Sequence, residues 1–414
     1  MRPLLALLVA LLLVTAAVLP VAGVYPTTER HETTNGPIPS IETVENTTNQ
    51  LTLPTGEVRR SSYNGSGIDV GTAAAAWSAQ LHHRHSALTF EERFRRADGS
   101  QARSRLVADR LSTIEAKRQA LDERQDSAIA SYASGERSAA EFLQTRHLVN
   151  AEASELLETL DRVAAAPDTA PGYSLSASTT TRVRAIEGEL RTLTGPIGSQ
   201  LQSGGATDRT LYIAASDDGY MLATVTDDEY VRETRLDSAR DASLTDEFLR
   251  TAATDGNQDT DRLDIADERA ASLYPWLYER QRPSFTFYGN SGIYELTAAH
   301  PNGDLTAYLD GGTTDIFYEE QVRDLSDVST TATARNVEGT LAVTARQSSA
   351  TGPLLVSATN NETGATVNAT VSINGQPVGT TGSDGVLWTI EPRGGYTVTV
   401  AADTGNTSVV VPAS

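Results

Sequence analysis

Hydrophobic residues recur at helical spacing between residues 73 and 166. The segment 73–96 carries Trp77, Leu81, Leu88 and Phe94 roughly on one side, and we expect that side to pack. Two further segments, 100–134 and 139–166, repeat apolar residues at heptad-like spacing: Val107, Leu111, Ile114, Leu121 and Ala128, then Phe142, Val149, Leu156 and Val163. The pattern predicts a helical hairpin over residues 73–166, with the first helix packed on it.

The sequence also predicts where these helices begin and end. Gly135 suits the C-cap of the first long helix, and Ser138-Ala-Ala-Glu141 has the form of a capping box that begins the next one. Residues 167–207 form a linker with a short helix at 182–193. Residues 24–72 are rich in Thr, Pro and Asn and show no sustained period, so we expect a linker there, with one edge strand at 49–54.

Residues 208–335 change to short apolar strands separated by turn residues. Strands at 211–216, 220–225 and 230–236 are followed by a helical stretch, and further strands follow at 284–288, 293–299, 305–309 and 316–320. The two halves share the same order of elements: strand, turn, strand and strand. We therefore expect a duplicated three-stranded meander around helices, which is an α+β domain.

Residues 336–414 alternate apolar and polar positions in short strands, with turns at Asn374-Gly375, Ser383-Asp384-Gly385 and Gly394-Gly395. This spacing predicts an immunoglobulin-like β-sandwich. The fold class that follows is multidomain α+β: a helical hairpin or coiled coil, a duplicated α+β meander domain and a C-terminal β-sandwich.

Residues 1–23 have the pattern of an export signal. Arg2 precedes an uncharged apolar run from Leu4 to Leu19, and Val21-Ala22-Gly23 suits cleavage after Gly23. A retained N-terminal anchor is the alternative, and it would place residues 4–24 in the membrane. Either reading puts the protein outside the cytoplasm, secreted or tethered to the outer face of the cell membrane.

The charge composition indicates the kind of organism from which the protein comes. The chain of 414 residues has a formal net charge of −21, and Lys117 is the only lysine among its 33 basic residues. An acidic surface with arginine in place of lysine is typical of proteins that work in molar salt, where charge is screened over about 3 Å. The charge argues against a nucleic-acid partner. The absence of cysteine excludes disulfides, thiolate metal sites and cysteine nucleophiles.

Three resemblances to known families follow from particular residues. The stretch Val371-Ser-Ile-Asn-Gly-Gln-Pro-Val-Gly-Thr-Thr-Gly-Ser-Asp-Gly-Val-Leu387 resembles the transthyretin-like, carboxypeptidase-regulatory-like modules of exported proteins. Gly292-Ile-Tyr294, Asn302-Gly-Asp304 and Leu309-Asp-Gly311 resemble PepSY-type modules, a family thought to bind or inhibit peptidases. The whole arrangement resembles uncharacterised exported haloarchaeal proteins, which implies a location and an architecture but no activity.

No catalytic motif is present, and the candidate sites are few. Asp255, Asn257, Asp259 and Asp261 alternate like calcium ligands, although Thr260 and Ala266 replace the Gly and Glu of an EF-hand loop. An irregular calcium site and an acidic loop before a helix both remain open. His82 and His85 are three residues apart on a predicted helix without a second cluster of ligands, and Gly289-Asn-Ser-Gly292 does not satisfy a serine-hydrolase turn. No cofactor is expected.

Five asparagines begin N-glycosylation sequons, which agrees with export. They are Asn46, Asn64, Asn361, Asn368 and Asn406. We expect a cell-surface or secreted glycoprotein without enzymatic activity that binds a protein partner. The alternative is an extracellular hydrolase of polysaccharide or peptide, with carboxylates of the α+β domain as acid and base, which needs an open cleft holding two carboxylates about 5–10 Å apart.

Overall fold

A computed structural model describes residues 41–54, 56–65, 67, 70–202, 210–226, 228–253 and 258–413, except for the side chains of 202, of 258–261 and of 332. The expected export signal at 1–23 lies outside the described residues. In the described ranges, no helix has the length and hydrophobicity needed to cross a membrane.

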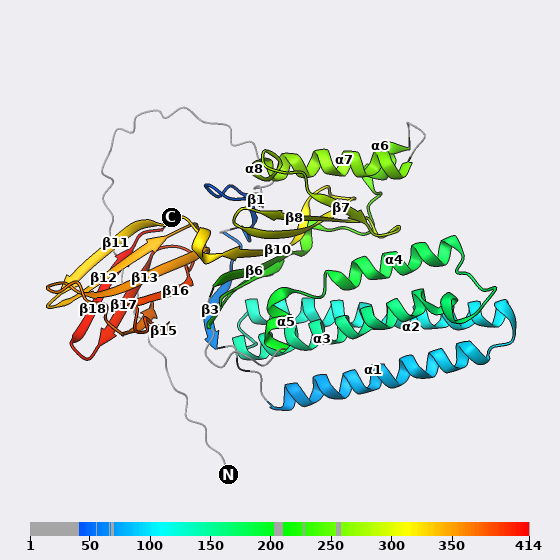
Figure 1. Ribbon diagram of the computed structural model, residues 1–414, viewed down its shortest axis with the longest axis horizontal. Coiled ribbons are helices and arrows are strands. Elements are labelled where there is room, and N and C mark those ends of the chain that lie inside the picture. The colour runs from blue at the N-terminus through cyan, green and yellow to red at the C-terminus, as the bar shows by residue number, and fades with distance from the viewer. Residues whose placement is uncertain are drawn as a thin grey trace, which may run out of the picture. The chain divides into compact units, whose positions relative to one another are not determined.

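Three long helices form the predicted hairpin with its additional helix (Figure 1): α1 (Val70–Arg96), α2 (Gly99–Ala133) and α3 (Ala139–Ala164). The capping box is confirmed, because the Glu141 N–H donates to Ser138 Oγ at 3.3 Å and the Ser138 N–H donates to Glu141 Oε2 at 2.9 Å. Gly135 has a φ of +84°, the left-handed conformation that favours glycine after a helix. The α2–α3 connection is therefore fixed by its own residues.

Two shorter helices follow, after the 3₁₀ turn Ala166–Thr169: α4 (Ala177–Arg191) and α5 (Pro196–Gln202). The predicted helix at 182–193 begins earlier than expected, because the hydroxyl of Ser176 accepts from the Thr179 N–H and caps the helix at Ala177. Val183, Ile186 and Leu190 join the apolar core formed by α1, α2 and α3.

In the described part of the chain, eight strands form one antiparallel sheet in the order β3-β4-β5-β6-β10-β9-β8-β7. The strands are β3 (Arg60–Gly65), β4 (Thr210–Ser216), β5 (Gly219–Val225), β6 (Glu229–Leu236), β7 (Ser284–Phe287), β8 (Ile293–His300), β9 (Gly303–Asp310) and β10 (Ile316–Asp324). The meander β4-β5-β6 joins the meander β8-β9-β10 through β6 and β10, so the duplicated meander is confirmed.

The expected linker at 24–72 is wrong for residues 41–53 and 60–65, which pack on or belong to the folded sheet. Residues 60–65 form β3, which pairs with β4 along its whole length and completes the edge of the sheet. Upstream, β1 (Ile41–Glu42) and β2 (Gln50–Leu51) form a small hairpin. Residues 41–53, here called the arm, lie on the sheet: Leu51 and Leu53 are buried in its core.

Helices cover both faces of this sheet. Apolar residues of α2, α3 and α5 pack on one face against β4, β5 and β6. The 3₁₀ turn Asp237–Ala239, α6 (Glu247–Ala252), α7 (Gln258–Leu273) and α8 (Pro275–Tyr278) follow β6, and these helices cover the other face together with the arm. Tyr274 and Leu277 are buried there, as expected of an aromatic cluster that anchors a helix on a sheet.

The C-terminal β-sandwich is confirmed and begins slightly earlier than residue 336, after the 3₁₀ turn Leu325–Asp327. In the described residues it has the four-stranded sheets β11-β12-β13-β16 and β15-β14-β17-β18. The strands are β11 (Thr331–Glu338), β12 (Leu341–Gln347), β13 (Pro353–Asn360), β14 (Thr370–Ile373), β15 (Gln376–Thr380), β16 (Val386–Ile390), β17 (Tyr396–Ala402) and β18 (Gly405–Val411). Valine side chains such as Val343, Val371 and Val398 fill the space between the sheets.

Candidate functional site

The outward face of α1 carries large apolar side chains that contact water. Val70 is 86% exposed, Trp77 73%, Leu81 64% and Leu88 59%, and the small Ala74 and the charged Arg84 between them are also exposed. These six residues follow one another at steps of three and four, which is the spacing of a coiled-coil seam. We call Val70, Ala74, Trp77, Leu81, Arg84 and Leu88 the outer stripe.

The opposite face of α1 is the one that packs. Thr72, His83, Ala87, Phe90 and Phe94 are buried, and the Phe94 ring lies edge-on to that of Tyr173 with 5.3 Å between centroids. The expectation that Trp77, Leu81 and Leu88 share the packed side with Phe94 is therefore wrong. The helix carries two heptad-like faces, and only the one that includes Phe94 meets α3.

Buried His83 belongs to this packing rather than to a metal site. Burial, and after it the nearby Lys117 ammonium, lowers the pKa of His83 to about 4. His82 and His85 point to solvent. The described residues contain no group of three or more His, Cys, Asp or Glu side chains that could hold a metal ion.

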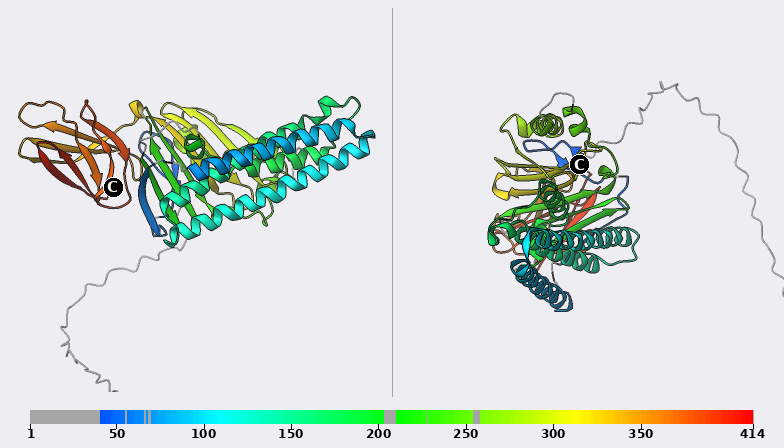
Figure 2. Two further views of the ribbon diagram at one scale, coloured as in Figure 1. Left: turned by 90° about the horizontal axis from the view of Figure 1, so that it is seen from below. Right: turned by 90° about the vertical axis from the view of Figure 1, so that its right-hand side faces the viewer.

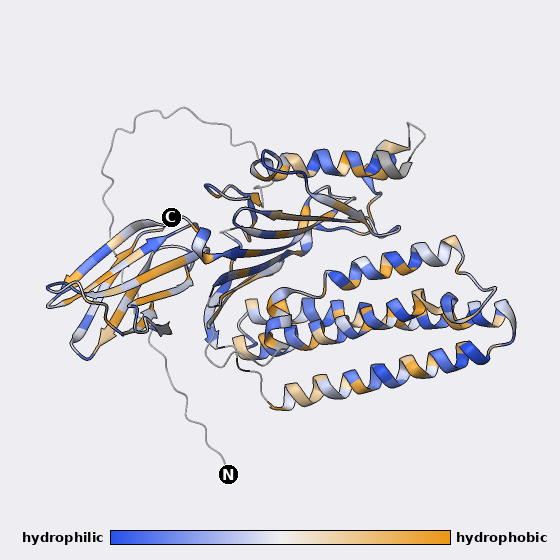
Figure 3. Cartoon of the chain, viewed as in Figure 1, coloured by the Kyte–Doolittle hydropathy of each residue, from blue (hydrophilic) through white to orange (hydrophobic). Residues whose placement is uncertain are grey.

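The charge of α1 sets it apart from the rest of the chain. Residues 70–83 include no charged side chain, and the second half of the helix has Arg84, Arg93, Arg95 and Arg96 against Glu91 and Glu92. Figure 3 shows the change from apolar to hydrophilic colours along the helix, and Figures 1 and 2 show α1 on the outside of the helical layer. Residues 70–83 thus expose an uncharged, partly apolar surface on a chain of net charge −21.

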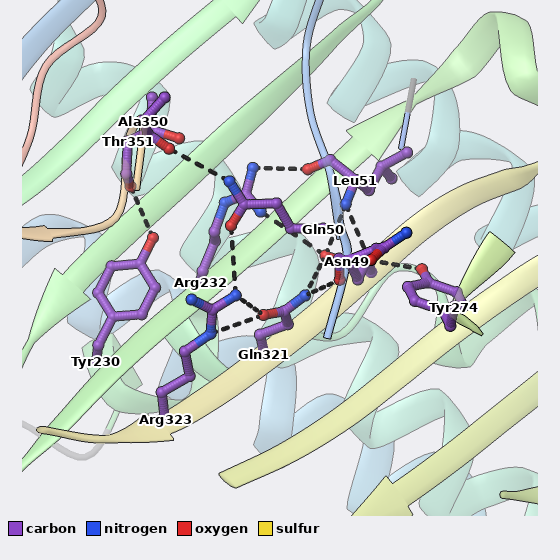
Figure 4. Close-up of polar contacts among 11 residues, drawn as sticks. Asn49, Gln50, Leu51, Tyr230, Arg232, Tyr274, Gln321, Arg323, Ala350 and Thr351 are labelled. Carbon is purple, nitrogen blue, oxygen red and sulfur yellow. Dashed lines mark hydrogen bonds and ion pairs between the residues drawn. The ribbon is translucent and has the colours of Figure 1, made fainter. Parts of the chain in front are cut away.

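A buried polar cluster joins the arm to the centre of the sheet (Figure 4). Glu319 on β10 is 1% exposed and accepts hydrogen bonds from the Leu51 N–H at 2.9 Å, from the Tyr274 hydroxyl at 2.6 Å and from Gln321 Nε2 at 2.9 Å. Arg232 Nη1 lies 3.7 Å from Glu319 Oε1, and Arg232 Nη2 donates to the Leu51 carbonyl at 2.6 Å. This arrangement, here called the arm cluster, holds both sides of the Leu51 peptide backbone.

The arm cluster continues to the β-sandwich. Arg323 donates to Gln321 Oε1 at 2.6 Å, while Gln50 Nε2 donates to the Ala350 carbonyl at 3.3 Å. The Tyr230 hydroxyl donates to the Thr351 carbonyl at 2.8 Å. Burial, and the nearby positive charge of Arg232, lower the pKa of Arg323 to about 10. Two buried guanidinium groups thus depend on the single carboxylate of Glu319 within this cluster.

A second buried ion pair lies on the opposite face of the sheet. Arg146 of α3 and Glu233 of β6 are 1% and 0% exposed, and Arg146 Nη2 is 3.2 Å from Glu233 Oε1. The Ile197 N–H donates to Glu233 Oε2 at 3.3 Å, and the Arg146 guanidinium lies over the Tyr220 ring at 5.0 Å from its centroid. Because Arg146 also donates to Gln125 of α2, this pair ties three helices to the sheet.

The carboxylates of Glu319 and Glu233 are both surrounded by other parts of the fold. Glu319 lies under the arm and Glu233 lies under α3 and α5, and each is engaged by hydrogen bonds and an arginine. Neither is open to a substrate, so the two clusters give no support to the hydrolase alternative.

Glu320, next to Glu319 on β10, faces the helices and pairs in register with Glu233. Burial, and after it the Glu233 carboxylate, raises the pKa of Glu320 to about 8. The folded chain therefore keeps a proton that the unfolded chain releases near its ordinary value of 4.5. Stability from this group is fully present below about pH 4.5 and is lost as the pH rises towards 8.

Replacing Glu320 with glutamine removes this pH dependence. We expect E320Q to match the native chain in thermal denaturation at pH 5 and to exceed it at pH 9 by about 2–4 kcal/mol of unfolding free energy. The exposed Glu279 supplies the control, since E279Q should change neither value. Equal shifts of E320Q at both pH values would contradict a protonated Glu320 in the folded chain.

A groove of about 1150 Å³ lies where the sheet meets the β-sandwich. Its walls come from β3, β4, β15 and β16 and include Tyr63, Gln376 and Trp388. Asp384 is the one carboxylate in its described lining, which otherwise combines uncharged polar residues with apolar ones such as Val378 and Leu387. The groove therefore offers hydrogen-bonding groups and two aromatic rings but no acid–base pair.

The structure places the other predicted residues as follows. Asp255 and Asn257 lie outside the described residues, and the side chains of Asp259 and Asp261 at the start of α7 are not described, so the calcium prediction stays open. Further along α7, Asp267 accepts from Arg282 at 2.6 Å and from the Tyr278 hydroxyl at 2.5 Å.

Four of the five sequon asparagines are exposed: Asn46, Asn361, Asn368 and Asn406. Asn64 is partly buried in β3, and its Nδ2 donates to the Gly65 carbonyl at 2.9 Å. Asn361 is also engaged, because Arg335 donates to its Oδ1 at 3.1 Å. Gly289 and Gly292 flank a turn between β7 and β8 with φ values of +60° and +71°, which accounts for that motif without catalysis.

Comparison with known families divides the chain into three segments. Residues 1–208, half of the 414, match the model described as Domain of unknown function (DUF7096). The chain belongs to the DUF7096 family. Residues 211–329 match a second model, Family of unknown function (DUF7094), and residues 332–411 match the Archaeal fibronectin-III type-like domain. No curated protein and no solved structure matches the chain.

The three matches refine the sequence-based description. The β-sandwich is of the archaeal fibronectin-III type, whereas a transthyretin-like module was the expected resemblance. The DUF7096 segment contains the arm, β3 and α1–α5, and the DUF7094 segment contains β4 from its second residue and β5–β10. Since β3 pairs with β4 and Leu51 bonds to Glu319, the two segments share one sheet and one core.

Proposed function

We propose that this chain is an exported, non-enzymatic interaction protein of a halophilic archaeon, displayed at the cell surface or secreted, and that it binds a protein through α1. The outer stripe is the observation that carries the proposal. Each of its large side chains is more than half exposed, which leaves apolar surface in water that a partner would cover.

Other features support the location and the absence of catalysis. The apolar run from Leu4 to Leu19, the sequons and the acidic, lysine-poor composition favour an extracytoplasmic protein in high salt. The segments that match known models are domains of unknown function and a fibronectin-III type-like domain, and many cell-surface domains share this sandwich architecture. The buried carboxylates of Glu233 and Glu319 are engaged in hydrogen bonds and ion pairs within the fold.

Cross-linking on living cells in molar salt tests the proposal. A tagged native chain should capture a recurring protein at near-equal abundance, identified by mass spectrometry. A chain with Trp77→Ser and Leu81→Ser should lose that product, because both side chains belong to the outer stripe and neither is needed for the core.

Leu244 provides the matched control, since it is 51% exposed and lies outside α1. The variant Leu244→Ser should retain the cross-linked product. The same products from the native chain and the α1 variant would contradict binding through α1, and turnover of a glycan or peptide substrate would favour the hydrolase.

A further inference from the structure

The outer stripe is complementary to itself when two copies of α1 run antiparallel. In that arrangement Trp77 of one copy lies opposite Leu81 of the other, Val70 lies opposite Leu88, and Ala74 lies opposite Arg84. All three pairs fall on one register, because the residue numbers of each pair have the same sum. Large apolar residues thus meet each other, and the longest side chain meets the smallest.

A parallel arrangement would lack this match. It would place Arg84 against Arg84 and Trp77 against Trp77, so that two like charges and the two bulkiest rings would share layers. The antiparallel register keeps them apart and generates a two-fold axis between Trp77 and Leu81. A two-fold axis makes the contact isologous and closed, with the same surface used on both copies.

The charge distribution favours a second copy at this place. Two chains of −21 repel each other wherever their carboxylates face, but residues 70–83 present no charge at the centre of the proposed contact. The packed face of α1, with Phe90 and Phe94, is occupied by the chain's own core. Docking of a second copy therefore needs no rearrangement of the fold.

We infer that the partner of the outer stripe is a second copy of this chain, bound through an antiparallel α1–α1 pair. This inference rests on the proposed function and names its partner. A single pair of helices is a small interface, so we expect a Kd in roughly the micromolar range. High salt strengthens the dimer, because it screens the repulsion between the acidic copies and favours apolar burial.

Sedimentation equilibrium of the full chain tests the association. We expect a reversible monomer–dimer equilibrium that shifts towards the dimer as the NaCl concentration rises from about 0.1 M to about 1 M. Trp77→Ser should raise the dimer Kd by about thirtyfold or more, as for a central aromatic contact, whereas Leu244→Ser should leave it unchanged. Both residues are exposed in the single chain, so an unchanged denaturation midpoint at a protein concentration well below the dimer Kd verifies that the variants fold.

Cysteine cross-linking tests the orientation, and the natural chain has no cysteine to interfere. Single variants Val70→Cys and Leu88→Cys are oxidised separately and as a mixture. The antiparallel register predicts a disulfide-linked dimer in the mixture only. A cysteine at exposed Ala75, on another side of α1, is the control and should remain unlinked.

The outcomes separate this inference from the proposed function. Cross-linking of each variant with itself would show parallel pairing and overturn the antiparallel register. A monomer at all salt concentrations would overturn the inference, whether a different protein or the chain's own residues 4–19 cover the outer stripe. If cells then yield another partner that Trp77→Ser removes, the proposed function stands; if they yield none, both fail.

Discussion

Replacing Glu319 with alanine should lower the free energy of unfolding by about 3–5 kcal/mol. The substitution leaves Arg232 and Arg323 buried without the carboxylate that offsets their charge, and both are at most 2% exposed. It also removes the acceptor for the Leu51 N–H and for the Tyr274 hydroxyl. Chemical denaturation at constant salt measures the loss.

The arm should respond more than the rest of the sheet. We expect the E319A chain to exchange the Leu51 amide hydrogen rapidly and to be cut by proteases within residues 41–53, while α2 and α3 stay protected. Exposed Glu229 on β6 is the control, because E229A should change stability by less than about 0.5 kcal/mol. A loss below about 1 kcal/mol in E319A would show that the arm is held by other contacts.

The Arg146–Glu233 pair should give the second large effect. Either Arg146→Met or Glu233→Met leaves a buried charge without its partner, at a cost of about 3–5 kcal/mol. The double variant removes both charges and keeps apolar volume between α3 and β6. We therefore expect the double variant to be more stable than either single variant.

A double-mutant cycle on denaturation free energies measures this coupling. The Arg59–Asp217 pair provides a surface comparison, since its side chains are 56% and 70% exposed and its closest atoms are 3.2 Å apart. The coupling there should be about 0.5 kcal/mol or less. Additive losses at Arg146 and Glu233 would mean that the two charges are compensated by other groups.

Periodicity predicted the elements but not which face of α1 packs. Both faces of α1 satisfy a heptad, so the pattern that selected Trp77, Leu81 and Leu88 fits either side equally well. The face with Phe90 and Phe94 packs because α3 and Tyr173 present an apolar surface to these two side chains. A second apolar repeat on one helix was the available signal for an interaction surface.

The burial of these charged residues could not be predicted from the sequence, because the whole chain is rich in acidic residues. In a chain this acidic, Glu233 and Glu319 look like surface residues, and the adjacent Glu319 and Glu320 face opposite sides of the sheet, both of which are covered. Strand β3 was missed because Arg60-Ser-Ser-Tyr-Asn-Gly65 lacks apolar alternation. An edge strand can take its stability from the backbone ladder to β4 rather than from buried side chains.

The contact between Leu51 and Glu319 spans 268 residues of sequence, and this separation orders the folding of the chain. The α2–α3 hairpin can close as soon as its own residues exist, whereas the arm has no partner until β10 has been made. We therefore expect the arm to fold last. Its threonines and asparagines keep the unfolded arm solvated and so limit its aggregation. At this stage Asn46 is most accessible to a glycosylating enzyme, because Thr48 of its sequon is not yet buried.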